Sequence, residues 1–363
     1  IHHRLVGSEM CIRDRDKLGT KPGRYIMFRK ALMALAAGLM ATSASAADKV
    51  EWNFSTWGNP RAFTKGFEAL AKHVDAETNG NFTIKIHYGG TISPPKENLD
   101  GISLGAFEMA NFCTSYHPGK NPVGTVLDLP FLPLKSWDVL VATHHDFSQH
   151  PLWANELARW NAMPVFSGVL PQYEFMGVGE PPRKLSDWKD MRVRALGGIG
   201  DAMRKLGSVP TTVPAPEVYT SLERGVVQAA SFPYSYTFGA YRIHEIGSWF
   251  TEGLQPGTVH CPIIMNGDAF NSLPAEYQNL IQSSSGVAYD ALKAAYAEAD
   301  KKWIPIYKER MEVITYTPEQ SAEFEKLAAK PVWNEWVEKY KGRFNSQAIL
   351  DHVLATAAAA AKK

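Results

Sequence analysis

The segment of this chain most similar to a cofactor motif is a glycine-rich turn at residues 197–200. It reads Gly-Gly-Ile-Gly, follows an expected strand and opens an expected helix, as the turn of a dinucleotide-binding unit does. The third glycine of that motif is replaced by Met203, and the next expected strand ends at Thr211 and Thr212 without an acidic residue for a ribose. We therefore expect no cofactor here. A turn that presents helix-terminal N–H groups to an anionic ligand fits better.

Two further patterns contain residue types used in catalysis or metal binding. Ser186 and Lys189 match the Ser-x-x-Lys of penicillin-recognising enzymes, but no later Lys-Thr-Gly or Ser-Asp-Asn completes that set. His144, His145 and His150 have no accompanying cysteine or carboxylate cluster, so we expect solvated side chains and no metal. No nucleophile elbow or paired-carboxylate motif is present in the sequence. These observations favour a protein that is not an enzyme.

The amino-terminal part predicts export to the periplasm. Arg29 and Lys30 precede about ten apolar residues, too few to span a bilayer, and residues 44–46 fit the small-x-small cleavage rule. We interpret residues 27–46 as a secretory signal peptide. We expect residues 1–26 to be a non-native extension of the gene model, because a signal peptide begins close to the true start.

Composition describes an ordinary globular protein. The 363 residues are 45% hydrophobic with a net charge of +1, and loss of the basic amino-terminal segment leaves a slightly acidic chain. That balance argues against nucleic acid and other polyanions as partners. Cys113 and Cys261 lie far apart in the sequence and do not form a disulfide scaffold. We expect two buried, unpaired thiols.

Hydrophobic patterns predict an α/β unit in the first part of the chain. Three segments read as strands and two helical patterns lie between them, in the order strand 50–55, helix 60–74, strand 82–88, helix 94–104 and strand 107–112. This order is typical of a parallel sheet covered by helices. After a proline-rich connector at 127–133, residues 137–160 read as helical and residues 164–169 as a strand.

A second α/β unit follows, and the end of the chain is mostly helical. Its expected elements are strands at 192–194, 226–230 and 259–265 and helices at 201–206 and 216–224. A long helical stretch runs from Pro274 to about residue 311 with a kink at Pro305. Thr317 and Gln320 form a capping box that opens another helix. We expect the alanine-rich end, from residue 355, to fray.

Two segments of the second unit resemble the extracytoplasmic solute receptors of TRAP transporters, the dicarboxylate-receptor type. Residues 185–194 are similar to the family's Leu-Lys-Gly-(apolar)-Lys-(apolar)-Arg strand entry. Residues 216–227 are similar to its Glu-Val-Tyr-x-Ala-Leu helix and following strand, and the resemblance covers nearly the whole mature chain. It implies a receptor without cofactor or metal, which closes over a small organic acid and delivers it to the TRAP membrane subunits.

The resemblance also implies the architecture. The fold is an α/β, two-lobed periplasmic-binding-protein fold with hinge strands and a long helix that bridges both lobes. Lobe I is expected at residues 47–171 plus 260–300. Lobe II, with the carboxy-terminal helices, is expected at residues 172–259 plus 301–363, with hinges near residues 171 and 259.

Arg194 is the residue that the resemblance places on the ligand, as the arginine that pairs with the substrate carboxylate. A guanidinium offers two parallel donors and keeps its charge, so it selects carboxylates by geometry. The alternative is that Arg194 only pairs with a neighbouring acid of the protein.

Two departures from the family limit the ligand. Sialic-acid-type receptors have Glu-Asn-Pro where this chain has Ser231, Phe232 and Pro233, and metal-bridged keto-acid receptors have Glu-Trp there. The second arginine of the former, twenty residues before Arg194, is replaced by Glu174 with Tyr173 beside it. A dianionic substrate and a metal bridge are therefore disfavoured.

These residues predict a monocarboxylate ligand with an apolar, aromatic or zwitterionic body. We expect the site to contain Arg194, Glu174 and a set of aromatic side chains, namely Trp57, Tyr116, Tyr173, Phe232, Tyr236 and Trp249. A receptor of an ABC importer and, further off, a secreted α/β enzyme remain alternatives.

Overall fold

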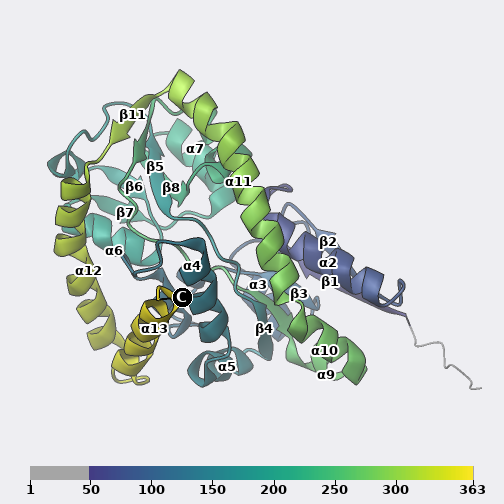
Figure 1. Cartoon of the computed structure of the whole chain (residues 1–363). Helices are drawn as coiled ribbons and strands as arrows, with labels where there is room; N and C mark the ends of the chain where they lie inside the picture. The colour runs from purple at the N-terminus through teal and green to yellow at the C-terminus, as the bar shows by residue number, and fades with distance from the viewer. Residues whose placement is uncertain (1–48, 363) are drawn as a thin grey trace, which may run out of the picture. The chain divides into compact units, whose positions relative to one another are not determined.

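Residues 49–362 are described by a computed structural model, in which they form two mixed α/β lobes (Figure 1). The expected signal peptide and the extension before it lie outside these residues. We call the sheet that contains β1, with its covering helices, the first lobe. The sheet that contains β5, with its helices, is the second lobe. The α/β class expected from the sequence is confirmed.

The first lobe is built on a five-stranded sheet of order β2-β1-β3-β10-β4. The first three strands are parallel and linked by helices, as predicted, and β10 is inserted antiparallel between β3 and β4. Its elements are β1 (Val50–Ser55), α2 (Lys65–Glu77), β2 (Phe82–His87), α3 (Asn98–Ser103), β3 (Met109–Asn111), α4 (Trp137–Ser148), α5 (Pro151–Ala158), β4 (Ala162–Phe166), β10 (Ile263–Asn266), α9 (Gly267–Asn271) and α10 (Ala275–Ser283). The helix expected from residue 60 begins later, because residues 59–61 form a loop and Ala62–Thr64 a 3-10 turn.

The second lobe is built on a six-stranded sheet of order β11-β9-β5-β8-β6-β7. Strand β5 is antiparallel to both of its neighbours, and the remaining pairs are parallel. Its elements are β5 (Tyr173–Gly177), β6 (Arg192–Arg194), α6 (Gly197–Lys205), β7 (Val209–Thr211), α7 (Val218–Glu223), β8 (Ala229–Pro233), α8 (Tyr236–Ala240), β9 (Trp249–Glu252) and β11 (Glu312–Thr315). Of these, β5, β9, β11 and α8 were not predicted from the sequence.

The chain crosses between the two sheets at residues 167–172 and 253–262, and one helix passes along both lobes. Helix α11 (Ser285–Arg310) contacts α2 of the first lobe and α8 of the second. Figure 1 shows it as the long green helix that runs from beside the second sheet down to α10. The predicted long helix bridging both lobes is therefore confirmed.

Two carboxy-terminal helices pack across the other side of the lobes. Helix α12 (Pro318–Tyr340) lies against α6, and α13 (Ser346–Ala360) lies against α4 (Figure 1). The predicted capping box is confirmed, since the backbone N–H of Thr317 donates to Gln320 Oε1 at 2.8 Å and that of Gln320 to Thr317 Oγ1 at 3.3 Å. The expected fraying of the alanine-rich end is wrong: α13 continues to Ala360, because side chains such as Ala357 are buried.

Cys113 and Cys261 form a disulfide, so the prediction of two free thiols is wrong. Strands β3 and β10 pair Asn111 with Ile263, and the pairing continues beyond both strands through the Thr114 N–H, which donates to the His260 carbonyl at 2.9 Å. In this register the two cysteines stand directly opposite each other. Their 148-residue separation hid the pairing in the sequence.

The surface exposure of helix α4 also differs from expectation. Of His144, His145 and His150, only His145 is exposed, whereas His144 is fully buried and its Nδ1 lies 2.7 Å from Ser167 Oγ.

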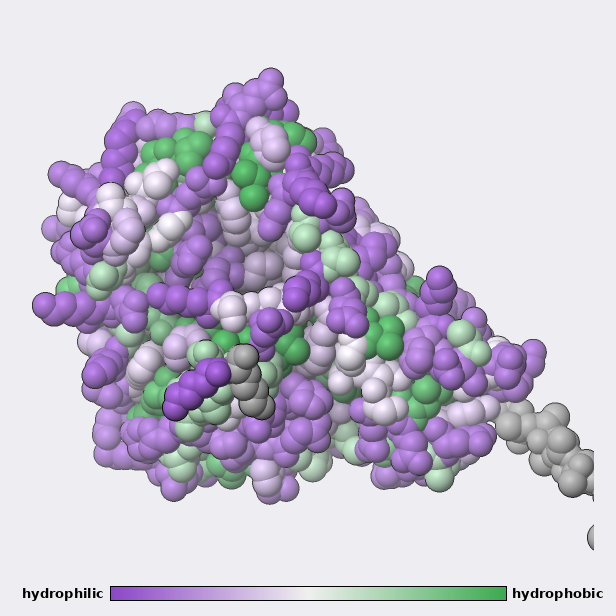
Figure 2. All heavy atoms as spheres, viewed as in Figure 1, coloured by the Kyte–Doolittle hydropathy of each residue, from purple (hydrophilic) through white to green (hydrophobic). Residues whose placement is uncertain are grey.

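Hydrophilic residues cover most of the face drawn in Figure 2. Within residues 49–362, no helix combines the length and the apolar character that a membrane span requires.

Candidate ligand-binding site

A cavity lies between the two lobes and is lined from both of them. The space between its lining atoms is about 360 Å³, which includes space open to solvent. The first lobe and the crossing segments contribute Trp57, Arg61, Phe63, Cys113, Tyr116, Leu170 and Cys261. The second lobe contributes Tyr173, Arg194, Ala215, Phe232, Pro233, Tyr236, Thr237 and Tyr241. No Asp or Glu is among these lining residues.

Arg194 is a buried cation without an anionic partner. Only 1% of its surface is exposed, its Nε donates to the Val213 carbonyl at 3.0 Å and its Nη1 donates to the Ser231 carbonyl at 2.6 Å. Its Nη2 has no acceptor within residues 49–362, and no acidic side chain of that range forms an ion pair with it. The alternative that Arg194 pairs with a neighbouring acid is therefore wrong.

The sheet register explains why Arg194 and Phe232 meet. Arg194, at the end of β6, stands beside Ala230 of the parallel strand β8. Phe232 follows two residues later in β8 and therefore points to the same face. The guanidinium carbon lies 4.3 Å from the centre of the Phe232 ring, so the ring supports the cation from one side.

The predicted aromatic residues Trp57, Tyr116, Tyr173 and Tyr236 also line this cavity. Tyr116 bridges the lobes, because its hydroxyl accepts the Ala215 N–H at 3.0 Å. Burial raises the pKa of the Tyr173 hydroxyl well above its usual range, although Arg194 nearby acts to lower it. That hydroxyl is therefore a neutral hydrogen-bond donor.

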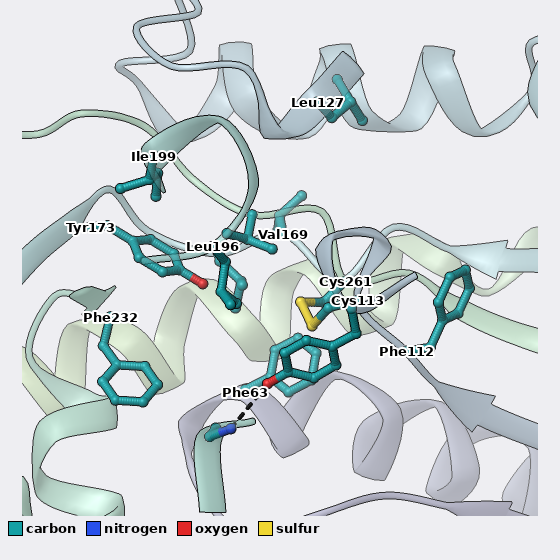
Figure 3. Close-up of a cluster of buried hydrophobic side chains, with 14 of the residues drawn as sticks. Phe63, Phe112, Cys113, Leu127, Val169, Tyr173, Leu196, Ile199, Phe232 and Cys261 are labelled. Carbon is teal, nitrogen blue, oxygen red and sulfur yellow. Dashed lines mark hydrogen bonds between the residues drawn. A yellow bond between two sulfur atoms is a disulfide. The ribbon is translucent and has the colours of Figure 1, made fainter. Parts of the chain in front are cut away.

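Figure 3 shows how the walls of the cavity face one another. Tyr173 and Phe232 lie on one side of the close-up, and the Cys113–Cys261 bridge with Phe63 lies on the other. The Tyr173 hydroxyl points towards the disulfide side. The disulfide and Phe63 thus form an apolar part of the wall that faces Tyr173 and Phe232.

Among the cavity residues that were not predicted from the sequence, three have polar side chains, namely Arg61, Thr237 and Tyr241. Arg61 lies in the loop before α2, with 9% of its surface exposed, and its guanidinium carbon is 5.7 Å from the centre of the Tyr241 ring. The hydroxyls of Thr237 and Tyr241 are buried and have no hydrogen-bond partner within residues 49–362. Arg61 was missed because the pattern around Pro60 predicted a helix there. Thr237 and Tyr241 belong to or follow the unpredicted helix α8.

Two predicted site residues, Glu174 and Trp249, do not line this cavity. Glu174 follows Tyr173 in β5 and therefore faces the other side of the sheet. Its carboxylate accepts hydrogen bonds from Thr251 Oγ1 at 2.6 Å and from the N–H of Gly253 at 2.9 Å. Trp249 is fully buried and packs against Trp188, with ring centres 6.0 Å apart.

The glycine-rich turn does not line this cavity either. It begins α6 and packs directly on Asp128, at the end of the 3-10 turn Gly124–Asp128. A Cβ atom at Gly198 would lie 2.2 Å from the Asp128 carbonyl oxygen. Glycine is needed for this close approach between the lobes, and an anion site at this turn stays a prediction.

The fold and the cavity define a two-lobed binding protein with its ligand site between the lobes. A model of the bacterial extracellular solute-binding proteins, family 7, matches residues 55–340. This chain belongs to that family, and the resemblance to TRAP solute receptors is confirmed. The family consists of receptors rather than enzymes. Membership of it does not support the alternative that this chain is the receptor of an ABC importer.

Curated and solved proteins resemble most of the chain at low identity. A monocarboxylate 2-oxoacid-binding periplasmic protein of Nostoc sp. is 24% identical over 307 residues, covering 79% of this chain and 83% of that protein. A TRAP solute-binding protein of Rhodoferax ferrireducens, in complex with benzoate, superposes with a TM-score of 0.76 at 19% identity, over 86% of this chain and 99% of that chain. One from Desulfovibrio salexigens, with bound orotic acid, gives 0.77 at 19% identity, over 86% and 100%.

Proposed function

We propose that this protein is a periplasmic receptor of a TRAP transporter and binds a small organic acid whose carboxylate is held by Arg194. The observation that carries the proposal is the buried guanidinium with a free donor group in a cavity that contains no acid. A buried charge is unfavourable unless it is paired, so an anionic ligand would complete the site. The delivery of this ligand to TRAP membrane subunits is inferred from the family.

The walls of the cavity favour a compact monocarboxylate with an apolar or aromatic body. Phe63, Phe232 and Leu170 supply apolar surface against which a ring could pack. Similar proteins are described with benzoate and orotic acid, both ring-bearing carboxylates. A zwitterionic body is less suited, because an ammonium group would find no carboxylate among the lining residues.

Closure of the lobes would complete the site in this mechanism. The hydrogen bond between Tyr116 and Ala215 and the contact between Arg61 and Tyr241 each join the first lobe to the second. Both contacts would be lost on opening about the crossing segments. A ligand that binds residues of both lobes would therefore favour the closed state.

Arg194→Ala is the direct test, with Arg192→Ala as the matched control. Arg192 lies on the same strand but is exposed and donates to the carbonyls of Gly225 and Val226. The purified mature protein is first screened by thermal shift against organic acids, and the affinity of the best acid is then measured by calorimetry. We expect Arg194→Ala to weaken binding by about thirty-fold to several thousand-fold, and Arg192→Ala to bind like the wild type. A folded Arg194→Ala protein that bound within about threefold of wild type would contradict the proposal.

A further inference from the structure

We propose that Arg61 is a second ligand-binding residue, which selects organic acids that carry a second oxygen acceptor at a distance from the carboxylate. This inference rests on the proposed function and assigns a role to the end of the cavity away from Arg194. Its basis is a pair of buried guanidinium groups, one from each lobe, in a cavity without an acidic lining residue.

The loop before α2 leaves one edge of the Arg61 guanidinium available. Its Nη1 donates to the carbonyls of Trp57 at 2.8 Å and Asn59 at 3.1 Å, which uses both hydrogens of that nitrogen. Its Nε and Nη2 have no acceptor within the described part of the chain, and no acid there pairs with Arg61. The side chain is thus held in place by its own loop while two donor groups remain unused.

Two aromatic rings separate the two cations. The Arg194 guanidinium lies 4.3 Å from the Phe232 ring centre, Phe232 is nearly parallel to Tyr241 with 5.9 Å between centres, and Arg61 lies 5.7 Å from the Tyr241 centre. Arg194 therefore lies beside Phe232 and Arg61 beside Tyr241 of this aromatic pair. A flat ligand lying along the rings, with its carboxylate at Arg194, would extend towards Arg61.

The other polar groups of the cavity suit a ligand with acceptors at both ends. The hydroxyls of Tyr241 and Thr237 are buried without partners in residues 49–362, so each can donate to a ligand oxygen. A ligand with a single carboxylate and a bare apolar body would leave these donors and Arg61 desolvated and unpaired. A ligand with a cationic group would face two positive charges and no acid. We infer that the second group is a carbonyl, a hydroxyl or a second carboxylate, and in the last case the ligand would be a dianion rather than the monocarboxylate proposed above.

A matched set of benzoates tests this selectivity by calorimetry. The set contains benzoate, the meta and para isomers of hydroxybenzoate and of benzenedicarboxylate, and meta-aminomethylbenzoate. For the wild type we expect at least one acid with a second acceptor to bind about tenfold or more tightly than benzoate, and the aminomethyl compound to bind most weakly. In Arg61→Met we expect this preference to fall to about twofold, with benzoate affinity changed by less than about threefold.

Two companion variants separate the possible outcomes. Tyr241→Phe removes only the hydroxyl and should reduce the preference partly, while thermal unfolding shows whether either variant is damaged. If Arg61→Met weakened all acids equally, or if the wild type showed no preference or bound none of them, the inference would be wrong. Arg194→Ala, measured on the same acids, distinguishes the underlying proposal. If Arg194→Ala bound these acids as tightly as the wild type, the proposed role of Arg194 would be wrong. If Arg194→Ala lost binding but Arg61→Met kept the wild-type preference, only the proposed role of Arg61 would be wrong.

Discussion

The buried carboxylates of this molecule and its buried cavity arginines differ in where their hydrogen bonds go. Asp128 accepts from Thr114 Oγ1 at 2.7 Å, from Ser115 Oγ at 2.6 Å and from the His260 N–H at 2.6 Å. Glu174 likewise accepts only from groups of its own chain. Both carboxylates are thus surrounded by donors that the fold supplies.

Arg194 and Arg61 are buried to a similar degree but keep donors that no described residue accepts. This difference in hydrogen bonding indicates whether a buried ionisable group belongs to the fold or to a binding site. Burial raises the pKa of Asp128 to about 7 and that of Glu174 to about 8, so both groups depend on their internal hydrogen bonds, whereas an arginine with open donors in a cavity can bind an anionic ligand. Variants of the two kinds should therefore separate stability from binding.

The disulfide is a strong test of this comparison, because it lines the cavity although both of its cysteines are bonded to each other. We therefore expect its loss to change stability. We expect Cys113→Ser together with Cys261→Ser to lower the free energy of unfolding by about 4 kcal/mol, since the bridge closes a long loop. Chemical denaturation with and without reductant measures this loss. Reduced wild type should match the double variant. A variant as stable as oxidised wild type would show that the bridge adds nothing to the fold.

Glu174 provides the sharpest contrast with Arg194. Glu174→Ala would leave the Thr251 hydroxyl and the N–H groups of Gly253 and Gln255 without their acceptor, so we expect a loss of about 3 kcal/mol in unfolding free energy. Ligand affinity should change little, because the carboxylate faces away from the cavity. Glu180→Ala, at a side chain 97% exposed, is the control. If Glu174→Ala strongly weakened ligand binding but left the unfolding free energy unchanged, Glu174 would be a ligand-binding residue and this prediction would be wrong.

A buried histidine that stays neutral in the fold is a third kind of buried group, and its effect on stability should depend on pH. Burial lowers the pKa of His144 to about 3, whereas the unfolded value is about 6.5. The unfolded chain therefore binds more protons below pH 6.5, so the stability that neutral His144 contributes is lost as pH falls. Between pH 6.5 and 4.5 we expect wild type to lose about 2 kcal/mol relative to His144→Gln. His145→Gln, at the exposed neighbour, should show the same pH dependence as wild type.

The sequence predicted those features that depend on local pattern. The strand carrying Arg194, the long helix α11 and the capping box of α12 each have a signal within a few residues, and all three are present. Strands β5 and β9 are short, and β5 is buried on both faces, so no alternation marked them. Without β5, the opposite orientations of Tyr173 and Glu174 could not be predicted.

The features that the sequence did not reveal depend on contacts between distant segments. The disulfide requires the register of β3 against β10, which only the folded sheet defines. Arg61 enters the site because its loop approaches Tyr241 of the other lobe. Local periodicity carries no information about either approach, so neither the disulfide nor the place of Arg61 in the cavity could be predicted from it.

Phe232 should have the smallest effect, because it supports the site without carrying its charge. Phe232→Leu keeps most of the buried apolar volume but removes the ring face beneath the Arg194 guanidinium. We expect affinity for the best acid to fall about fivefold, near 1 kcal/mol, because the cation loses one side of its support and the ligand loses an aromatic wall. Phe238→Leu is the matched control: Phe238 packs against Phe232 with ring centres 5.8 Å apart but does not line the cavity. Equal losses of affinity in the two variants would mean that general packing, rather than the ring face at Arg194, is responsible.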